Sequence, residues 1–191
     1  MELFFATGNK GKFASAKRIM EGEGIILKQV ELDIKEPRSD TIEEISINKA
    51  KQAFEILKKP VMVEDSGFII ESLGNFPGPY INFVLKTIGI NGILKLVGEN
   101  RDCFFRSVVT YYDGKTLKTF HLDEHGKIAK TPSKKQKGAA WSELWKIFIP
   151  EGYEKTLNDL EEEEFKKKQE EYKKNSGFHQ LARWILSRNS E

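Results

Sequence analysis

The sequence predicts an α/β fold, because short apolar runs typical of buried strands alternate with segments typical of helices. Residues 2–6 form the first such run, and a glycine-rich turn then opens a helix from residue 10 to about residue 20. Residues 26–33 alternate in polarity like a strand, and residues 61–63 form a third short strand. Strand-like runs separated by helices are the pattern of a sheet covered by helices.

The strongest helical signal lies between residues 41 and 58. Thr41, followed three residues later by Glu44, fits a capping box, in which each side chain bonds the other residue's backbone N–H. Four apolar side chains then fall on one stripe at about 100° per residue: Ile42, Ile45, Ala53 and Ile56. This stripe predicts the buried face of the helix.

The middle of the chain is expected to contain a turn-rich segment, two short helices and a hairpin. In order, these are residues 74–79, the helices around 81–87 and 91–97, and the strands 104–112 and 115–122. Asp113-Gly114 joins the two strands and is a strong hairpin signal.

The last third is predicted to be irregular and then helical. Residues 126–140 are basic and irregular, and Lys134-Lys135-Gln136-Lys137 is read as an exposed loop rather than a phosphate contact. The chain is expected to be helical from Thr156, with a break near Ser176-Gly177. Glutamates four residues before lysines in 161–174 are typical of a solvated helix face.

The composition bounds the class of protein. A chain of 191 residues forms one domain or two small lobes, and 39% hydrophobic with 31% charged residues is ordinary for a soluble protein. A net charge of +2 does not indicate a nucleic-acid partner. The single cysteine, Cys103, excludes an intrachain disulfide. We find no signal peptide and no run of the ~20 apolar residues that a membrane span needs, and therefore expect a cytoplasmic protein.

The loop Thr7-Gly8-Asn9-Lys10-Gly11-Lys12 follows the first apolar run and carries groups that bind phosphate. It lacks the spacing of a P-loop, but its glycines let backbone N–H groups approach an anion at a helix start. Asn9 offers an amide donor and Lys12 a cation. The alternative is a tight strand-to-helix turn with solvated lysines.

The loop Glu64-Asp65-Ser66-Gly67 follows the third strand and carries adjacent carboxylates. Consecutive residues of an extended chain face opposite ways, so the one on the loop side would bind metal or activate water. Magnesium takes oxygen ligands and shares its shell with substrate phosphates. Glu36, beside Pro37, is a further candidate ligand, and simple solvation is the alternative for each acid.

Lys49 projects into the apolar stripe of the 41–58 helix. A lysine there must be paired, extend its ammonium to solvent or meet a ligand, because an unpaired buried charge is costly. We favour an anion site over extension to solvent.

Several segments, in this order and spacing, resemble the inosine triphosphate pyrophosphatase (Ham1-like) family over almost the whole chain. They are Thr7-Gly8-Asn9 with Lys12, Glu43-Glu44-Ile45-Ser46-Ile47-Asn48-Lys49-Ala50, Val63-Glu64-Asp65-Ser66-Gly67, Phe76-Pro77-Gly78-Pro79-Tyr80, Phe148-Ile149-Pro150-Glu151-Gly152 with Thr156, and Lys174-Asn175 with His179. The resemblance implies an elongated α/β fold of two lobes within one domain, residues 1–191, with a long central mixed sheet flanked by helices and a cleft between the lobes. It also implies a homodimer.

The implied reaction is hydrolysis of a nucleoside triphosphate to the monophosphate and pyrophosphate with Mg²⁺. By resemblance, Asn9, Lys12 and Lys49 would bind the triphosphate. Glu36 and Asp65 would hold magnesium, and Asp65 would also orient or deprotonate water, with Lys12 as its catalytic partner. The remaining substrate-binding candidates implied are Thr7, Gly8, Ser66, Trp145, Lys174, His179 and Gln180.

The sequence departs from the family pattern in the segments that build the base pocket. Where the family carries an aromatic-Gly-aromatic-Asp-Pro segment, this chain has Ser142-Glu143-Leu144-Trp145-Lys146, and a shifted alignment would make Trp141 the retained aromatic. The family's Ser-His-Arg is Phe178-His179-Gln180 here.

The leading hypothesis is a pyrophosphatase of deaminated purine nucleotides (ITP, dITP and XTP). The alternatives are a nucleotide pyrophosphatase with broader base preference, a non-catalytic nucleotide-binding protein, and, last, a single-stranded nucleic-acid binder using residues 134–137 with Trp141 and Trp145.

Overall fold

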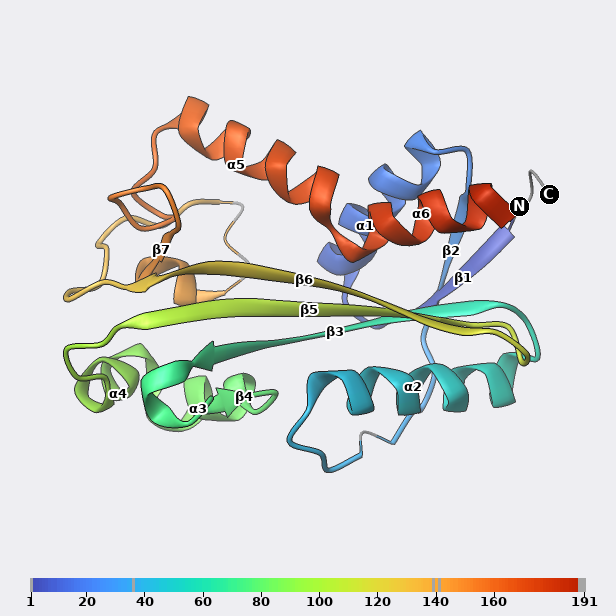
Figure 1. The fold of residues 1–191 in the computed structure, drawn as a ribbon, viewed down its shortest axis with the longest axis horizontal. Coiled ribbons are helices and arrows are strands. Elements are labelled where there is room, and N and C mark those ends of the chain that lie inside the picture. The colour runs from blue at the N-terminus through green and yellow to red at the C-terminus, as the bar shows by residue number, and fades with distance from the viewer. Residues whose placement is uncertain (1, 36, 139, 141, 189–191) are drawn as a thin grey trace. The chain divides into compact units, whose positions relative to one another are not determined.

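The computed structural model describes residues 2–35, 37–138, 140 and 142–188 (Figure 1). The chain divides into two compact units. Unit 1 comprises Met1–Asp65, Ser107–Leu122 and Glu171–Glu191, and unit 2 comprises Ser66–Arg106 and Asp123–Glu170.

The described residues contain one seven-stranded mixed sheet with the order β2-β1-β3-β5-β6-β7, and β4 pairs with β3. The strands are β1 (Glu2–Ala6), β2 (Ile26–Val30), β3 (Val61–Ile70), β4 (Pro77–Gly78), β5 (Asp102–Tyr112), β6 (Leu117–Ile128) and β7 (Phe148–Pro150). β1 pairs in parallel with β2 and β3, whereas β4 on β3 and β7 on β6 are antiparallel.

Helices flank this sheet, which confirms the predicted α/β class with a central mixed sheet (Figure 1). The α-helices are α1 (Lys10–Gly22), α2 (Ile42–Leu57), α3 (Ile81–Thr87), α4 (Gly89–Leu96), α5 (Glu162–Asn175) and α6 (Gly177–Arg188), and the 3₁₀ helices are η1 (Glu71–Leu73) and η2 (Glu143–Lys146). No helix of the described residues has the length and apolar character needed to cross a membrane.

In unit 1, helices cover both faces of the sheet (Figure 1). One core joins α1 and α6 to the strands, with Leu3, Met20 and Leu181 fully buried. On the other face, α2 packs Ala50 and Ala53 against Val61 and Val63. Each side chain of β3 in this unit therefore faces one of two separate helix layers.

Unit 2 has its own core, in which α3, α4 and η2 contribute buried apolar side chains. Phe68 and Phe148 are fully buried there, and their ring centroids lie 6.2 Å apart. Burial raises the pKa of the Cys103 thiol to about 12, so this cysteine is a structural residue of the core rather than a nucleophile.

The structure corrects the predicted third strand, which does not end before the acidic residues. β3 continues through Glu64, Asp65 and Ser66 to Ile70. The strand continues because Phe68-Ile69-Ile70 supplies further buried side chains, and because each carboxylate has a lysine partner that offsets its charge.

Other predictions from the sequence were also wrong. β2 ends at Val30 because its partner β1 ends opposite, at Ala6, so residues 31–33 have no strand to pair with there. Helix α5 begins at Glu162 rather than near Thr156, whose hydroxyl instead donates to Asp159. Ile56 is 55% exposed, because Phe54 and Leu57 fill the core at the end of α2.

Candidate active site

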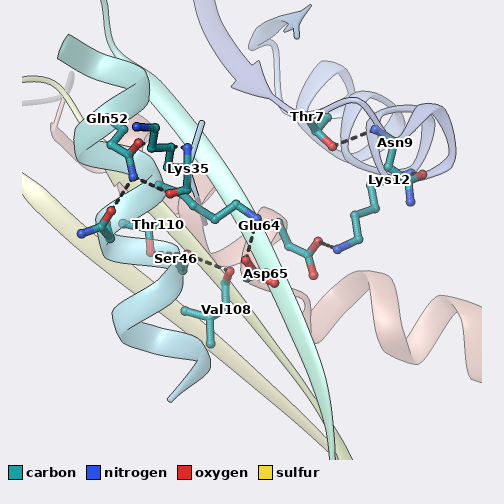
Figure 2. A network of polar contacts seen from close by, with 12 residues as sticks. Thr7, Asn9, Lys12, Lys35, Ser46, Gln52, Glu64, Asp65, Val108 and Thr110 are labelled. Carbon is teal, nitrogen blue, oxygen red and sulfur yellow. Dashed lines mark hydrogen bonds and ion pairs between the residues drawn. The ribbon is translucent and has the colours of Figure 1, made fainter. Parts of the chain in front are cut away.

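The turn between β1 and α1 is built by its own side chains. Asn9 is the N-cap of α1, and its Oδ1 accepts a hydrogen bond from the backbone N–H of Lys12 at 3.0 Å. The Asn9 N–H donates to the Thr7 hydroxyl at 3.1 Å (Figure 2). Gln29 donates to the Thr7 carbonyl at 2.9 Å. The carboxamide oxygen of Asn9 thus caps the helix, which leaves its NH2 group as the donor to a phosphate.

The space beside Gly8 is open. A Cβ added at Gly8 would lie no closer than 3.8 Å to another side chain, that of Glu31. Gly8 therefore leaves room for an anion at the start of α1, where the backbone N–H groups and the helix dipole favour negative charge.

Lys12 extends from α1 to Glu64 of β3. Its Nζ lies 2.6 Å from Glu64 Oε2, and the Glu64 side chain is only 6% exposed. Ser107 of β5 donates to the other oxygen, Oε1, at 3.0 Å. The first of the two adjacent carboxylates is thus held on the α1 face of β3.

Asp65 lies on the opposite face of β3, towards α2 (Figure 2). Its Oδ2 accepts a hydrogen bond from Lys49 Nζ at 2.7 Å, with both side chains largely buried. The prediction that Glu64 and Asp65 face opposite ways is therefore confirmed. Of the outcomes considered for Lys49, the structure shows pairing.

A buried polar contact fixes the helix that carries Lys49. The hydroxyls of Ser46 and Thr110 lie 2.7 Å apart and both residues are fully buried, while the Ser46 hydroxyl also reaches the Val108 carbonyl at 3.3 Å (Figure 2). Since Ser46 is almost one turn before Lys49, this contact sets where the lysine leaves α2.

The segment before α2 is tied to the helix by Gln52. Its amide donates to the Lys35 carbonyl at 2.8 Å and accepts from the Lys35 N–H at 3.1 Å (Figure 2). Thr41 caps α2 as predicted, but Glu44 accepts a hydrogen bond from Ser39 at 2.5 Å, an arrangement that differs from the expected capping box. Glu36, the other predicted metal ligand, lies outside the described residues.

A small pocket of about 320 Å³ lies beside the first turns of α2. Its lining combines two cations, one carboxylate, two polar side chains and two apolar residues: Pro37, Arg38, Ser39, Glu44, Ile47, Asn48 and Lys51. With Arg38, Lys51 and Glu44, the pocket carries charges of both signs.

The carboxylate oxygens of Asp65 are ligands of the kind that a hard divalent cation prefers. Among the described residues, no group of three or more metal-binding side chains gathers at one place. Magnesium, however, is usually held by only one or two carboxylates and completes its shell with water and substrate phosphates. Asp65 could therefore act as one such carboxylate ligand.

Three predicted residues lie on either side of the break between α5 and α6. Lys174 is near the end of α5, and His179 and Gln180 are in the first turn of α6. Lys174 is exposed, and His179 Nδ1 lies 3.4 Å from a Glu23 carboxylate oxygen. Gln180 Nε2 donates to the His121 and Asn175 carbonyls, both at 2.9 Å. The NH2 group of Gln180 thus donates within unit 1, and the side-chain oxygen of Gln180 is a hydrogen-bond acceptor.

Two predicted residues, Ser66 and Trp145, belong to unit 2. Ser66 follows Asp65 in β3. Trp145 lies in η2, is 8% exposed and packs its ring 5.6 Å from that of Phe165. Trp145 is therefore a core side chain in this structure, and Trp141 lies outside the described residues.

Three contacts of unit 1 were missed by sequence reasoning: those of Gln29, Gln52 and Ser107. Each joins residues at least 17 positions apart, at the Thr7 carbonyl, the Lys35 backbone and the Glu64 carboxylate. No local pattern signals such contacts, because they depend on which segments the fold brings together.

Comparison with known proteins gives the same family as the motifs do. The model of the Ham1 family matches residues 3–181. A dITP/XTP pyrophosphatase of Methanopyrus kandleri is 45% identical over 167 residues, which cover 86% of this chain and 87% of that protein. A dITP/XTP pyrophosphatase of Saccharolobus solfataricus is 39% identical, covering 83% of this chain and 81% of that protein.

Among solved structures, a HAM1 protein from Coxiella burnetii superposes with a TM-score of 0.80 at 20% identity, covering 98% of this chain and 99% of the other. That similarity shows the shared fold. With the family match across most of the sequence, it confirms the resemblance drawn from the motifs: the chain belongs to the Ham1 family.

Proposed function

We propose that this protein hydrolyses deaminated purine nucleoside triphosphates (ITP, dITP and XTP) to the monophosphate and pyrophosphate, and so removes them from the nucleotide pool. The relatives named dITP/XTP pyrophosphatase support this substrate class. The observation that carries the proposal is structural. Two adjacent carboxylates each hold a lysine, at 2.6 and 2.7 Å, in the unit that also contains the Asn9-capped start of α1.

The triphosphate would be bound by Lys12, Lys49 and the turn Thr7-Gly8-Asn9. The open space at Gly8 and the NH2 group of Asn9 supply neutral donors, and the lysines supply charge. Cleavage of an anhydride needs positioning and charge neutralisation more than a protein nucleophile, and this set of groups provides both.

Asp65 and Glu36 would hold the divalent cation, which we propose is Mg²⁺. The cation, when bound, neutralises charge that develops on the phosphate oxygens. Asp65 would also orient the attacking water and accept its proton, as a carboxylate at the edge of the phosphate site can do. For this, Asp65 must exchange Lys49 for its new partners while Lys49 moves to a phosphate oxygen.

The nucleoside end would be closed by Lys174, His179 and Gln180, and Ser66 and Trp145 are kept as substrate-binding residues by resemblance to the family alone. Because Gln180 presents a carbonyl oxygen where an arginine would present donors, we propose a base preference broader than the family's. We also propose that the whole chain acts as one pyrophosphatase domain, as a cytoplasmic homodimer.

The test is product analysis with dITP. Incubation with Mg²⁺ should release one pyrophosphate per monophosphate and no orthophosphate, and chelation should stop the reaction. A protein that binds dITP at equilibrium but releases neither product would instead be a non-catalytic nucleotide-binding protein. Release of orthophosphate without pyrophosphate would reject the proposed reaction.

A further inference from the structure

Glu64 is the one residue of the two ion pairs that the proposed function does not use. Its side chain is more than nine-tenths buried, at 6% exposure. Ser107 donates to Oε1 at 3.0 Å. Lys12 Nζ lies 2.6 Å from Oε2 (Figure 2). Such burial of a carboxylate is costly unless opposite charge and hydrogen bonds compensate for it.

The two oxygens of Glu64 are not compensated in the same way. Oε1 has the Ser107 hydroxyl as a donor, whereas Oε2 has no aligned hydrogen bond within the part of the chain that the structure describes. The nearby ammonium of Lys12 compensates Oε2 through charge alone. Removal of Lys12 from this position would therefore leave a buried carboxylate oxygen without compensation.

Lys12 is also the lysine of the phosphate-binding turn, and its side chain is 30% exposed. It follows that Lys12 cannot move fully to a phosphate oxygen without a cost at Glu64. That cost would fall when a divalent cation arrives with the triphosphate, because a cation held by Asp65 brings positive charge to the residue next to Glu64 in β3. A polyphosphate without a metal brings only negative charge, so it does not compensate the buried carboxylate of Glu64.

We propose that Glu64 is a positioning residue that holds Lys12 as its counter-ion and thereby makes the phosphate site selective for metal-bound triphosphate. This inference rests on the proposed function, since it takes Lys12 as a phosphate ligand. Glu64 couples the two binding events: the cation and the triphosphate each bind better when the other is present. Without Glu64, Lys12 would be available to any polyphosphate.

The experiment is calorimetric titration of inorganic tripolyphosphate, with EDTA and separately with Mg²⁺, into the wild-type protein and Glu64→Gln. Glutamine keeps the shape of the side chain and removes its charge. In EDTA, the variant should bind on the order of tenfold more tightly, equivalent to about 1.4 kcal/mol. With Mg²⁺ the two proteins should differ much less, so the metal dependence of binding should shrink.

Two further variants separate this role from a merely structural one. Glu21→Gln removes a carboxylate that pairs with Lys17 at 3.7 Å on the exposed face of the same helix, and it should change neither titration. In a Lys12→Met background, Glu64→Gln should no longer tighten metal-free binding. Glu64→Asp, which keeps the charge but shortens its reach, provides a second test if the glutamine variant does not fold.

Three results would overturn the inference. One is equal affinity of the wild type and Glu64→Gln for tripolyphosphate in EDTA, including no detectable binding by either. Another is weaker binding by the variant only with Mg²⁺, which would make Glu64 a metal ligand. The third is tightening that persists without Lys12. Pyrophosphate release by the wild type from dITP, measured on the same preparation, tests the proposed function separately.

Discussion

The residues proposed to bind phosphate and metal differ from those proposed to meet the base in how the protein holds them. The first group, the phosphate-side residues, comprises Lys12, Lys49 and Asp65, which are held in ion pairs. The second group, the base-side residues, comprises Trp145 and Gln180. Trp145 is buried in the core of unit 2, and Gln180 is bound to two backbone carbonyls.

This difference matters because the two kinds of contact respond differently to substrate. An ion pair can be exchanged for a phosphate on one side and a cation on the other, with charge balanced throughout. In contrast, the tryptophan is fixed by packing in the core, and the Gln180 amide is fixed by two hydrogen bonds to backbone carbonyls. We infer that the phosphate-side residues are arranged for the reaction common to the family. The base-side residues lie in the segments where this sequence departs from the family pattern.

The most damaging change to the phosphate-side residues should be Asp65→Asn. Loss of the proposed base and metal ligand should lower turnover at least ~10²-fold, the scale of general-base contributions. The fold should survive, because asparagine keeps the size of the side chain. Steady-state pyrophosphate release, with circular dichroism as the control, measures this, and near-normal turnover would refute the role of Asp65.

Lys49→Met should raise the KM for dITP roughly tenfold to hundredfold, since a charge-assisted hydrogen bond to phosphate is worth about 1.5–3 kcal/mol. The variant should also lose stability, on the order of 1–2 kcal/mol, because Asp65 would keep its charge without Lys49. Denaturant unfolding measures this loss of stability.

Lys51→Met on the same helix is the matched control for Lys49→Met, because Lys51 is exposed and lines the neighbouring pocket instead. Lys51→Met should leave the stability unchanged, and it should alter the KM for dITP less than Lys49→Met does. An unchanged KM in Lys49→Met would show that Lys49 is only a structural counter-ion of Asp65.

The comparison also shows what the sequence could and could not predict. The Thr41 cap and the opposite faces of Glu64 and Asp65 were predictable, because each depends on neighbours within a few residues. The partners of the lysines were not, since Lys12 meets Glu64 and Lys49 meets Asp65 across the fold.

The same limit applies to the base-side residues and to strand ends. Nothing local indicates that Gln180 donates to His121, 59 positions away. The end of β3 was misplaced for a related reason. Polar residues at 64–66 look like a loop in isolation, and they belong to a strand because buried apolar residues follow them and lysines from two helices offset their charge.

On the base side, Gln180→Arg should widen the preference for ITP over ATP. An arginine can only donate hydrogen bonds and so favours the 6-keto oxygen over the 6-amino group, whereas the Gln180 oxygen can accept from adenine. The gain should be at most about 1–3 kcal/mol, the value of a hydrogen bond to a charged donor.

The ratio of kcat/KM for ITP and ATP in both proteins measures the effect of Gln180→Arg. Gln180→Glu, which keeps the acceptors and loses the donors to His121 and Asn175, is the matched control and should not favour ITP. A wild type that already rejects ATP as completely as the arginine variant would disprove the role of Gln180.

The smallest expected effect concerns Gln52, which supports the phosphate side through Lys35, the residue before Glu36. Gln52→Leu should raise the Mg²⁺ concentration that gives half-maximal activity by about two- to tenfold, the scale of one lost hydrogen bond. Gln52→Glu, which keeps only the bond from the Lys35 N–H, should lie between leucine and wild type. An unchanged metal requirement in both variants would separate Gln52 from the metal site.

The central claim, pyrophosphate chemistry on deaminated purines, is tested most directly by one panel of nucleotides with the wild-type protein. ITP, XTP, dITP, GTP and ATP are each assayed with Mg²⁺, and pyrophosphate and orthophosphate are quantified separately. We expect pyrophosphate as the sole phosphate product, with kcat/KM highest for ITP, XTP and dITP. Orthophosphate as the main product, or ATP as the best substrate, would contradict the account.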